Sequence, residues 1–504
     1  MPSKIFAFLI LLAPFSAFAE VTYHKDIAPI VYANCTSCHR EGESAPFSLS
    51  NYEEVSRKAK TIARVVDDGY MPPWHASPKH LPFQDVRRLS SDEISKFSLW
   101  LEAGKPEGDP AAAPQMPDFP KGWQLGEPDL VVSMAKAYEV PADGPDIYRN
   151  FVLPLDLPED KWVKAIELRP SARSVLHHSL FFLDDSGTAR SLDGKDGKPG
   201  FSGMGFRKSG SLGGFVPGAT SKRLPGDLAR PLPKGSDIVL STHFHPSGKV
   251  ENERTTIGLY FADSPPSRQL QEVQVPPGFG RGVGIDIPAG ESNYVIEDSF
   301  TLPVDYEAIS VGGHAHYICK TMEMTATLPD GERKVLLEIT DWDMDWQDTY
   351  YFEESVILPA GTIIKSVISY DNSSNNPANP HIPSQRIKWG RESTDEMGSI
   401  TLIGVPVEAD DFTRLSRATK VERAKILTSL GRELINSRVA SRLPRIIKSL
   451  DKNRDDNLDA SELPERMRAA LLLKLDADGD KSLNPSELQA LKDWLENLKA
   501  SEGV

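Results

Sequence analysis

The sequence predicts a multidomain protein with a small all-α domain, two antiparallel β-sandwich domains and a C-terminal α-helical pair. Three observations indicate this arrangement. Amphipathic helical periodicity is confined to residues 20–103 and 409–504. Residues 129–408 instead carry short β-like runs separated by Gly, Pro and Asp turns, which is typical of all-β sandwiches. A chain of 504 residues has room for three or four domains at about 150 residues each.

Residues 1–19 predict a secretory signal peptide. Lys4 precedes an apolar run that ends in Ala17-Phe18-Ala19, a small-x-small cleavage signal. Pro14 interrupts the apolar core, and no other segment has the roughly 18 apolar residues of a transmembrane helix. We therefore expect an exported protein, periplasmic or extracellular, that is soluble after cleavage and has no stable membrane span. The net charge of −15 and the lack of a basic patch argue against nucleic-acid binding.

Residues 20–103 contain the motif CTSCH. Thiols at Cys35 and Cys38 have the spacing that binds the two vinyl groups of one heme, and His39 then reaches the iron. A zinc site would need two more ligands, and a redox dithiol would need a βαβ context that this segment lacks. The motif therefore predicts covalently bound heme c.

The later stretch MPPWHASPKH offers the sixth iron ligand. Its Met-Pro-Pro-Trp loop resembles the distal segment of small class I cytochromes c, in which a methionine caps the iron. On that resemblance the segment is a cytochrome c domain and Met71 is the ligand, with His75 as the alternative. Residues 104–128 then predict a Pro-rich linker.

The β-rich block is large for one sandwich, and we divide it into residues 129–270 and 271–408. Six of the eleven histidines form three clusters in its strand-like runs, which are His177-His178, His243-Phe244-His245 and His314-Ala315-His316. Residues i and i+2 of a strand share a face, so the last pair can converge on one metal. The adjacent pair can do so only where the strand bulges or ends. A thioether from another strand, at Met397, would favour copper.

The order His-His, THFHP, His-x-His and TDEM over residues 127–408 resembles the copper type II, ascorbate-dependent monooxygenases, which are the peptidylglycine α-hydroxylating and dopamine β-monooxygenases. The resemblance implies two jelly-roll sandwiches and two copper ions. The electron-transfer copper would be held by His177, His178 and His243. The oxygen-activating copper would be held by His314, His316 and Met397. His245 would be a partner of a ligand or an alternative to His243.

The implied reaction is hydroxylation of a C–H bond in a small organic substrate by O₂. We expect electrons to come through the heme, from a redox protein or an ascorbate-like reductant. The peptide-amidating enzymes bind a substrate carboxylate with an arginine where this chain has Gly312, so a peptide substrate is disfavoured. Cys319 reads as a buried hydrophobe or a thiol near copper. The alternatives are a non-catalytic copper and heme electron carrier, and a zinc hydrolase, although no His-Glu-x-x-His motif is present.

The C-terminal region predicts a basic helical linker over residues 409–448 and an EF-hand pair that binds calcium over residues 449–504. The loop ligands would be Asp451, Asn453, Asp455, Asn457, Asp459 and Glu462, followed by Asp476, Asp478, Asp480, Ser482, Asn484 and Glu487. Both loops lack the usual glycine at position 6, where they have Asp456 and Lys481, and this turn favours a positive φ. An acidic helix-turn-helix that binds no metal is the alternative.

Overall fold

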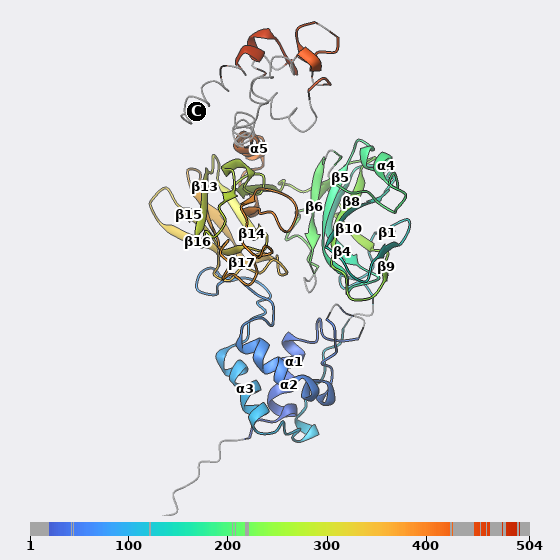
Figure 1. Ribbon diagram of the computed structural model, residues 1–504, viewed down its shortest axis with the longest axis vertical. Coiled ribbons are helices and arrows are strands. Elements are labelled where there is room, and N and C mark those ends of the chain that lie inside the picture. The colour runs from blue at the N-terminus through green and yellow to red at the C-terminus, as the bar shows by residue number, and fades with distance from the viewer. Residues whose placement is uncertain are drawn as a thin grey trace, which may run out of the picture. The chain divides into compact units, whose positions relative to one another are not determined.

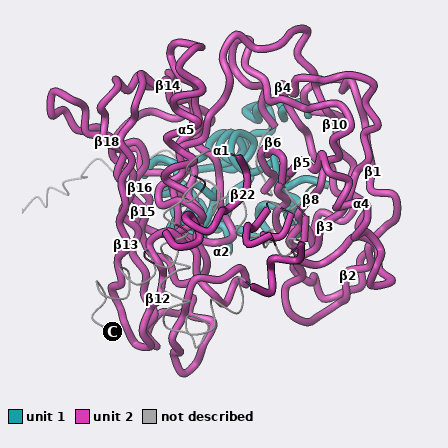
Figure 2. Tube along the Cα trace, turned by 90° about the horizontal axis from the view of Figure 1, so that it is seen from above, with its two compact units in different colours: residues 1–74, 87–121 teal, residues 75–86, 122–504 magenta. Residues whose placement is uncertain are grey.

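The computed structural model describes residues 20–423 apart from 42, 44, 120–121, 204, 207 and 217–220, and further on residues 426, 448–453, 455–459, 461–463, 476, 480–490 and 493. The predicted signal peptide lies outside the described residues. The chain divides into two compact units, residues 1–74 with 87–121 and residues 75–86 with 122–504 (Figure 2). Within the described part, no helix has the length and apolar character needed to cross a bilayer.

The first unit contains the N-terminal helices. They are η1 (Tyr23–Ile27), α1 (Ala28–Asn34), α2 (Tyr52–Asp67), α3 (Ser91–Glu102) and η2 (Pro110–Ala112). Helix α3 begins with a capping box, in which Ser90 and Glu93 satisfy each other's backbone N–H groups. Helix α2 buries Val55, Ala59 and Ile62 on one face, at the spacing of an amphipathic helix.

The predicted fold class is wrong in assigning residues 20–103 to a small all-α cytochrome c domain. The described chain consists mainly of β-strands, and residues 75–86 belong to the second unit. Ala76 and Phe83 form β-bridges with Ile339 and Phe352. The reason is that the backbone of this segment finds its hydrogen-bond partners on sandwich strands, and Phe83 is buried there against aromatic rings. Helical periodicity carries no signal for such pairing.

The first sandwich lies in the second unit and has two antiparallel four-stranded sheets (Figure 1). One sheet has the order β3 (Ile147–Leu153), β8 (Asp237–Phe244), β5 (Leu176–Asp184) and β6 (Gly210–Phe215). The other has the order β1 (Leu130–Ser133), β10 (Thr256–Phe261), β4 (Lys161–Arg169) and β7 (Arg230–Leu232). Apolar residues of both sheets form one continuous core, including Phe151, Val163 and Leu240. Flanking elements are β2 (Tyr138–Val140), β9 (Glu251–Glu253) and α4 (Thr188–Leu192).

The second sandwich is built in the same way. One sheet has the order β13 (Tyr294–Thr301), β18 (Ile363–Tyr370), β15 (Cys319–Thr327) and β16 (Arg333–Ile339). The other has the order β11 (Gln271–Val275), β20 (Gly398–Pro406), β14 (Tyr306–Ala315) and β17 (Thr349–Leu358). Flanking elements are β12 (Asp286–Ile287), β19 (Ile387–Lys388) and η3 (Arg281–Val283).

The two sandwiches share one strand topology. Their sheets have the orders 1-10-4-7 and 3-8-5-6 in the first, and 11-20-14-17 and 13-18-15-16 in the second. Each number in the second sandwich is ten higher than its counterpart in the first. Eight strands arranged in this way form a jelly roll. The two sandwiches are therefore structural repeats.

The C-terminal part is described in segments. Its elements are η4 (Ala409–Asp411), α5 (Phe412–Arg423), β21 (Leu458–Asp459) and β22 (Ser482–Leu483). Strands β21 and β22 pair antiparallel, with Leu458 opposite Leu483. Both leucines are buried. The two acidic loops are thus joined by a short two-stranded sheet, through the apolar residue that each loop contributes.

Candidate metal and heme centres

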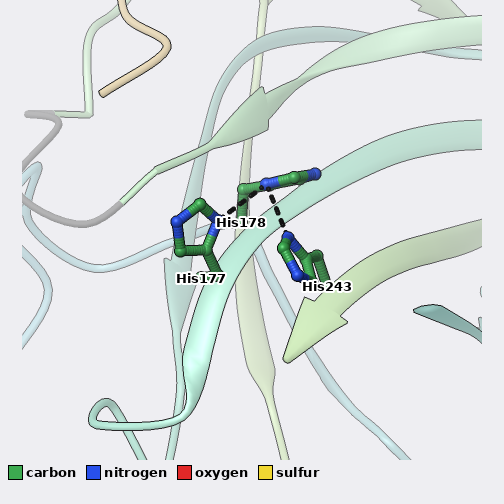
Figure 3. Close-up of side chains that lie close together, drawn as sticks. All are labelled: His177, His178 and His243. Carbon is green, nitrogen blue, oxygen red and sulfur yellow. Dashed lines mark hydrogen bonds between the residues drawn. The ribbon is translucent and has the colours of Figure 1, made fainter. Parts of the chain in front are cut away.

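The first candidate centre is a cluster of three histidines on neighbouring strands of the first sandwich. His177 and His178 come from β5, and His243 comes from β8 (Figure 3). The Nδ1 atom of His178 lies 3.1 Å from Nδ1 of His177 and 3.4 Å from Nδ1 of His243. One ligand atom from each of the three histidines lies within 4.8 Å of the others. Three nitrogens at these separations can bind one metal ion.

A β-bulge allows adjacent histidines to converge. The register between β5 and β8 shifts between Leu176 and His178, so the alternation of side chains is broken there. The sequence requires such an irregularity if His177 and His178 are to face one ion, and it is present. The bulge therefore explains how neighbours in one strand point to one place.

Two carboxylates bond to the histidine nitrogens that point away from the centre of this cluster. His243 Nε2 lies 2.8 Å from Asp146 Oδ2, and His177 Nε2 lies 2.9 Å from Asp345 Oδ1. When each Nε2–H donates to its carboxylate, Nδ1 keeps its lone pair for a metal. The other oxygen of Asp146 lies 2.8 Å from Nδ1 of His245, which is mostly exposed. His245 thus contacts a partner of the cluster and lies outside the group of three.

The electrostatics of this cluster favour neutral rings at His178 and His243. Burial lowers the pKa of His178 well below its usual value, and the neighbouring histidines lower it further. Burial also lowers the pKa of His243, although Asp146 opposes the shift. Burial acts to raise the pKa of Asp146, but hydrogen bonds from His243 and His245 outweigh it and leave that pKa at about 2. An ionised carboxylate behind neutral imidazoles is the arrangement that metal-binding histidines use.

The second candidate centre lies at the paired ends of β14 and β20. His314 and His316 have ring centroids 5.5 Å apart. In the register of these strands, His314 faces Ser399 and Ala315 faces Gly398. His316 follows the last residue of β14, and Met397 precedes the first residue of β20, so both lie one residue beyond the pair Ala315 and Gly398. The paired strand ends thus carry His314, His316 and Met397 close together along the backbone.

The imidazoles of the second centre are held by their Nδ1 atoms. His314 Nδ1 lies 2.6 Å from Gln347 Oε1, and His316 Nδ1 lies 3.2 Å from the carbonyl oxygen of Asp395. Donation from each Nδ1–H leaves Nε2 as the metal-binding atom. Burial lowers the pKa of His314 to about 4 and that of His316 to about 3, so both are neutral at pH 7.

A buried carboxylate that the sequence reasoning missed fixes the second centre. Glu396 accepts backbone N–H groups from His316 at 2.6 Å, Met397 at 2.8 Å and Ile318 at 3.3 Å. Burial raises its pKa to about 8, although these bonds oppose the shift. Glu396 therefore ties the segment that carries His316 to the segment that carries Met397. The sequence feature that points to Glu396 is its position directly before Met397 in the motif TDEM.

Close packing around the second centre explains the two glycines before His314 and the buried state of Cys319. A Cβ on Gly313 would meet Met322 Sδ and the ring of Trp342, so a larger residue there would have to displace the buried Met322 side chain. A Cβ on Gly312 would lie 3.2 Å from the carbonyl oxygen of Asp348. Burial raises the pKa of Cys319 well above its usual value, so this residue is a neutral, buried thiol. Of the two interpretations of Cys319, the buried hydrophobe fits.

The heme motif lies at the end of α1 in the first unit. Cys35 and Cys38 are free thiols, and the backbone N–H groups of Cys38 and His39 bond to the carbonyl of Cys35. His39 Nδ1 lies 3.0 Å from the carbonyl oxygen of Phe47, which leaves Nε2 for an iron. Burial and the neighbouring Cys38 raise the pKa of Cys35 to about 12. Heme attachment at this motif stays a prediction.

The two candidates for the sixth iron ligand belong to different units. Met71 follows α2 in the first unit, where its backbone N–H bonds to Val65. His75 belongs to the second unit, where its Nε2 is buried and makes no hydrogen bond within the described part of the chain. His80, from the same stretch, pairs with Glu338. The choice between Met71 and His75 stays a prediction.

The acidic loops have the backbone of calcium loops where they are described. Position 6 has a φ of 63° at Asp456 and 66° at Lys481, the positive value that this turn demands. Glu462, at position 12, accepts backbone N–H groups from Lys452 and Asp459. Glu487 accepts that of Asn484 in the second loop. Asp478 lies outside the described residues.

Comparison with known proteins assigns no family. No protein-family model and no curated protein matches the chain. The major capsid protein P2 of bacteriophage PM2 is 12% identical with a TM-score of 0.24, over 55% of this chain and 97% of that one. A peptide-N(4)-(N-acetyl-β-D-glucosaminyl) asparagine amidase is 9% identical with a TM-score of 0.25, over 55% and 96%. TM-scores at this level support no conclusion about this chain.

Proposed function

We propose that the protein is an exported, copper-dependent monooxygenase that hydroxylates a C–H bond of a small organic substrate. The observation that carries the proposal is the pairing of two histidine clusters with different donor sets in one unit of the chain. One cluster converges three Nδ1 atoms, and the other has two Nε2 atoms, with Met397 directly before β20 as its proposed thioether ligand. The histidines of the second cluster also lower the pKa of His178 in the first, so the clusters are electrostatically coupled.

The donor sets favour copper over zinc. Imidazole accepts either metal, but a thioether is a soft ligand that selects Cu(I). Bound copper would carry single electrons and activate O₂, which zinc cannot do. The overall reaction consumes the substrate, O₂, two electrons and two protons, and it yields the hydroxylated product and water. Two one-electron sites supply the required pair.

The chain's own residues would prepare both sites before any metal binds. Asp146 and Asp345 orient imidazoles of the first cluster, and Gln347 orients His314 in the second. Burial lowers the pKa values of His178 and His314, so no proton has to leave either ring at pH 7 for a metal to bind. Glu396 holds the two backbone segments of the second cluster at a fixed distance.

Heme c at Cys35, Cys38 and His39 would deliver the electrons, and the acidic loops would bind calcium. A heme is a one-electron carrier, which matches a copper that accepts one electron at a time. Stopped-flow mixing of reduced-heme protein with its Cu(II) form should show heme oxidation as copper is reduced. A heme that stays reduced would remove this part of the proposal.

The decisive test replaces the sulfur of the second cluster. Met397→Leu keeps the volume of the side chain and removes the soft ligand, so O₂-dependent product formation should fall at least about 100-fold. Met324→Leu makes the same exchange in the buried core of the same sandwich and should leave the rate within about twofold. O₂ uptake and product are measured across a panel of small C–H substrates. Equal rates in wild type and Met397→Leu would favour the rival function, a copper and heme electron carrier.

A further inference from the structure

One loop of the second sandwich contacts both histidine clusters. Residues 340–348 connect β16 to β17. Asp345 lies 2.9 Å from His177 of the first cluster, and two residues later Gln347 lies 2.6 Å from His314 of the second. The connecting loop, as we call residues 340–348, therefore contacts an imidazole in each cluster from the side opposite the metal-binding nitrogens.

The connecting loop is held in one conformation by its own hydrogen bonds. Asp343 accepts the N–H of Asp345 through its carboxylate and that of Trp346 through its carbonyl. Gln347 Nε2 donates to the carbonyl of Met344 at 3.0 Å, which fixes the amide so that its oxygen faces His314. Trp342, which is buried, donates its indole N–H to the carbonyl of His316 at 3.2 Å. The acceptors are thus fixed on a rigid element.

The acceptors differ in charge between the two clusters. The first cluster has carboxylates behind His177 and His243, from Asp345 and Asp146. The second cluster has only neutral oxygens at the corresponding places, the amide of Gln347 and a backbone carbonyl. A carboxylate makes the imidazole that donates to it a stronger electron donor, which stabilises the higher charge of Cu(II). A neutral acceptor does this less, and a thioether favours Cu(I).

We propose that the connecting loop sets the direction of electron flow, by placing a carboxylate behind the first cluster and an amide behind the second. The proposal rests on copper binding at both clusters, as the proposed function requires. With copper bound at both clusters, an electron passing from the first site to the second would oxidise the first metal by one unit and reduce the second by one. Because the first site would stabilise Cu(II) more, this transfer would run downhill toward the proposed site of O₂ activation. Asp345 and Gln347 act as positioning residues, since each works through a histidine.

The test measures the preference of each site for Cu(II) over Cu(I). The full-length protein is titrated with a redox mediator, and Cu(II) is followed by electron paramagnetic resonance. His316→Ala removes copper binding at the second cluster, so that the signal of the first cluster is measured alone. His178→Ala removes copper binding at the first cluster, so that the second is measured alone. Asp345→Asn keeps an acceptor oxygen for His177 and removes the charge. It should lower the Cu(II) preference of the first site about tenfold, which is about 59 mV for one electron.

Gln347→Glu introduces a charge at the other end of the connecting loop and should raise the Cu(II) preference of the second site about tenfold. Asp341→Asn is the matched control, because it removes the same charge from the same loop at an exposed side chain. It should shift neither site. Shifts of equal size for Asp341→Asn and Asp345→Asn, or no shift for Asp345→Asn and Gln347→Glu at copper-loaded sites, would overturn the inference and leave the monooxygenase proposal standing. Failure of both clusters to bind copper would overturn both.

Discussion

Four imidazoles of the two clusters each have one nitrogen bound to a protein acceptor and one left for a metal. His177 and His243 use Nε2 for the protein, whereas His314 and His316 use Nδ1. The acceptor on the far side of the ring therefore decides which atom faces the metal. The same residue type is presented in two ways, and the difference comes from residues far away in the sequence.

His243 lies in β8 and His245 directly follows its last residue, and the sequence leaves open which of them is a ligand. Because His243 lies in the cluster of three and the imidazole of His245 bonds to Asp146 outside that cluster, we expect unequal losses. His243→Ala should lower copper affinity at the first cluster more than about 100-fold, and His245→Ala at most about tenfold. Isothermal titration of the apo-protein with Cu(II) measures both. A larger loss in His245→Ala would reverse the assignment.

The buried imidazoles should make the apo-protein sensitive to acid. The pKa values of about 4 for His314 and about 3 for His316 lie below the usual value near 6.5, because burial penalises the charged ring. The unfolded state therefore binds more protons below pH 6.5, so stability is complete above that pH and is lost as pH falls toward the folded pKa. Each histidine contributes at most about 1.4 kcal/mol per pH unit in this window.

Urea unfolding of chelator-treated protein between pH 7 and pH 4.5 measures this loss. His316→Gln should have a shallower pH dependence than wild type, because one titrating ring is gone. His245→Gln, at an exposed position, should keep the wild-type slope. Identical slopes in all three proteins would show that the cluster histidines are protonated equally in the folded and unfolded states.

How much of the site the sequence predicts depends on how far apart in the sequence its contacting residues lie. Strand parity suffices to pair His314 with His316, since both candidate ligands lie in one run. Asp146, Asp345 and Gln347 reach their histidines across 97, 168 and 33 residues, and no local pattern marks such contacts. The candidate ligands were therefore open to prediction, and the acceptors behind them were not.

At the scale of elements, two sandwiches of equal topology carry their clusters on different sheets. The first cluster lies on β5 and β8 of the 3-8-5-6 sheet. The second lies at the ends of β14 and β20, which correspond to β4 and β10 of the other sheet. The centres are therefore not copies produced by the repeat. The repeat itself was not visible in the sequence, because β-sandwiches conserve an in-and-out pattern that many different residues satisfy.

Glu396 joins two strand ends, so its loss should act on the site as well as on stability. Glu396→Ala leaves the N–H groups of His316 and Met397 without their acceptor. We expect a loss of about 1–3 kcal/mol in the free energy of unfolding and weaker copper binding at the second cluster. Glu396→Gln keeps an acceptor oxygen and should lose less of both.

Glu253→Ala is the matched control for this change. Glu253 is equally buried and accepts the backbone N–H of Ala172, but it lies in the first sandwich. Its replacement should lower stability and leave copper binding at the second cluster unchanged. Thermal unfolding and copper titration separate the two effects. If Glu253→Ala weakened that copper site as much as Glu396→Ala, the effect would be one of general stability.

The paired acidic loops should bind calcium cooperatively, because β21 and β22 join them through Leu458 and Leu483. Glu487→Gln removes the bidentate ligand of the second loop and should also weaken binding at the first, by several-fold in Ca²⁺ titration. Glu422→Gln, in α5 outside the loops, is the control. Unchanged affinity at the first loop in Glu487→Gln would mean that the loops act independently.

At the scale of the whole molecule, the chain crosses the boundary between the units three times, whereas two consecutive domains would require one crossing. The chain enters the second unit after Trp74, returns at Arg87 and leaves again after residue 121. The intervening segment, residues 75–86, is fixed on the second sandwich by the pairing of Ser77 N–H with Glu338 and of Gln84 N–H with Tyr351. This is the feature on which the predicted all-α domain failed, since pairing between distant segments leaves no periodic trace.

This anchoring predicts how electrons would reach the proposed copper sites. The heme motif is joined to the unit that carries both histidine clusters through residues 75–86 and again after residue 121, so a heme bound there would have an effective concentration on the order of millimolar at that unit. Electron transfer from heme to copper should therefore be first order. Its rate constant should stay the same when the protein concentration is varied tenfold in stopped-flow experiments.

Phe83→Ala removes the ring that stacks on Phe352 and should loosen the anchor, which slows transfer without changing the heme spectrum. The control is Phe47→Leu, which lies beside the heme motif and should alter the spectrum first. A transfer rate that rises in proportion to protein concentration would mean that the heme of one molecule reduces the copper of another. The anchored segment would then have a purely structural role.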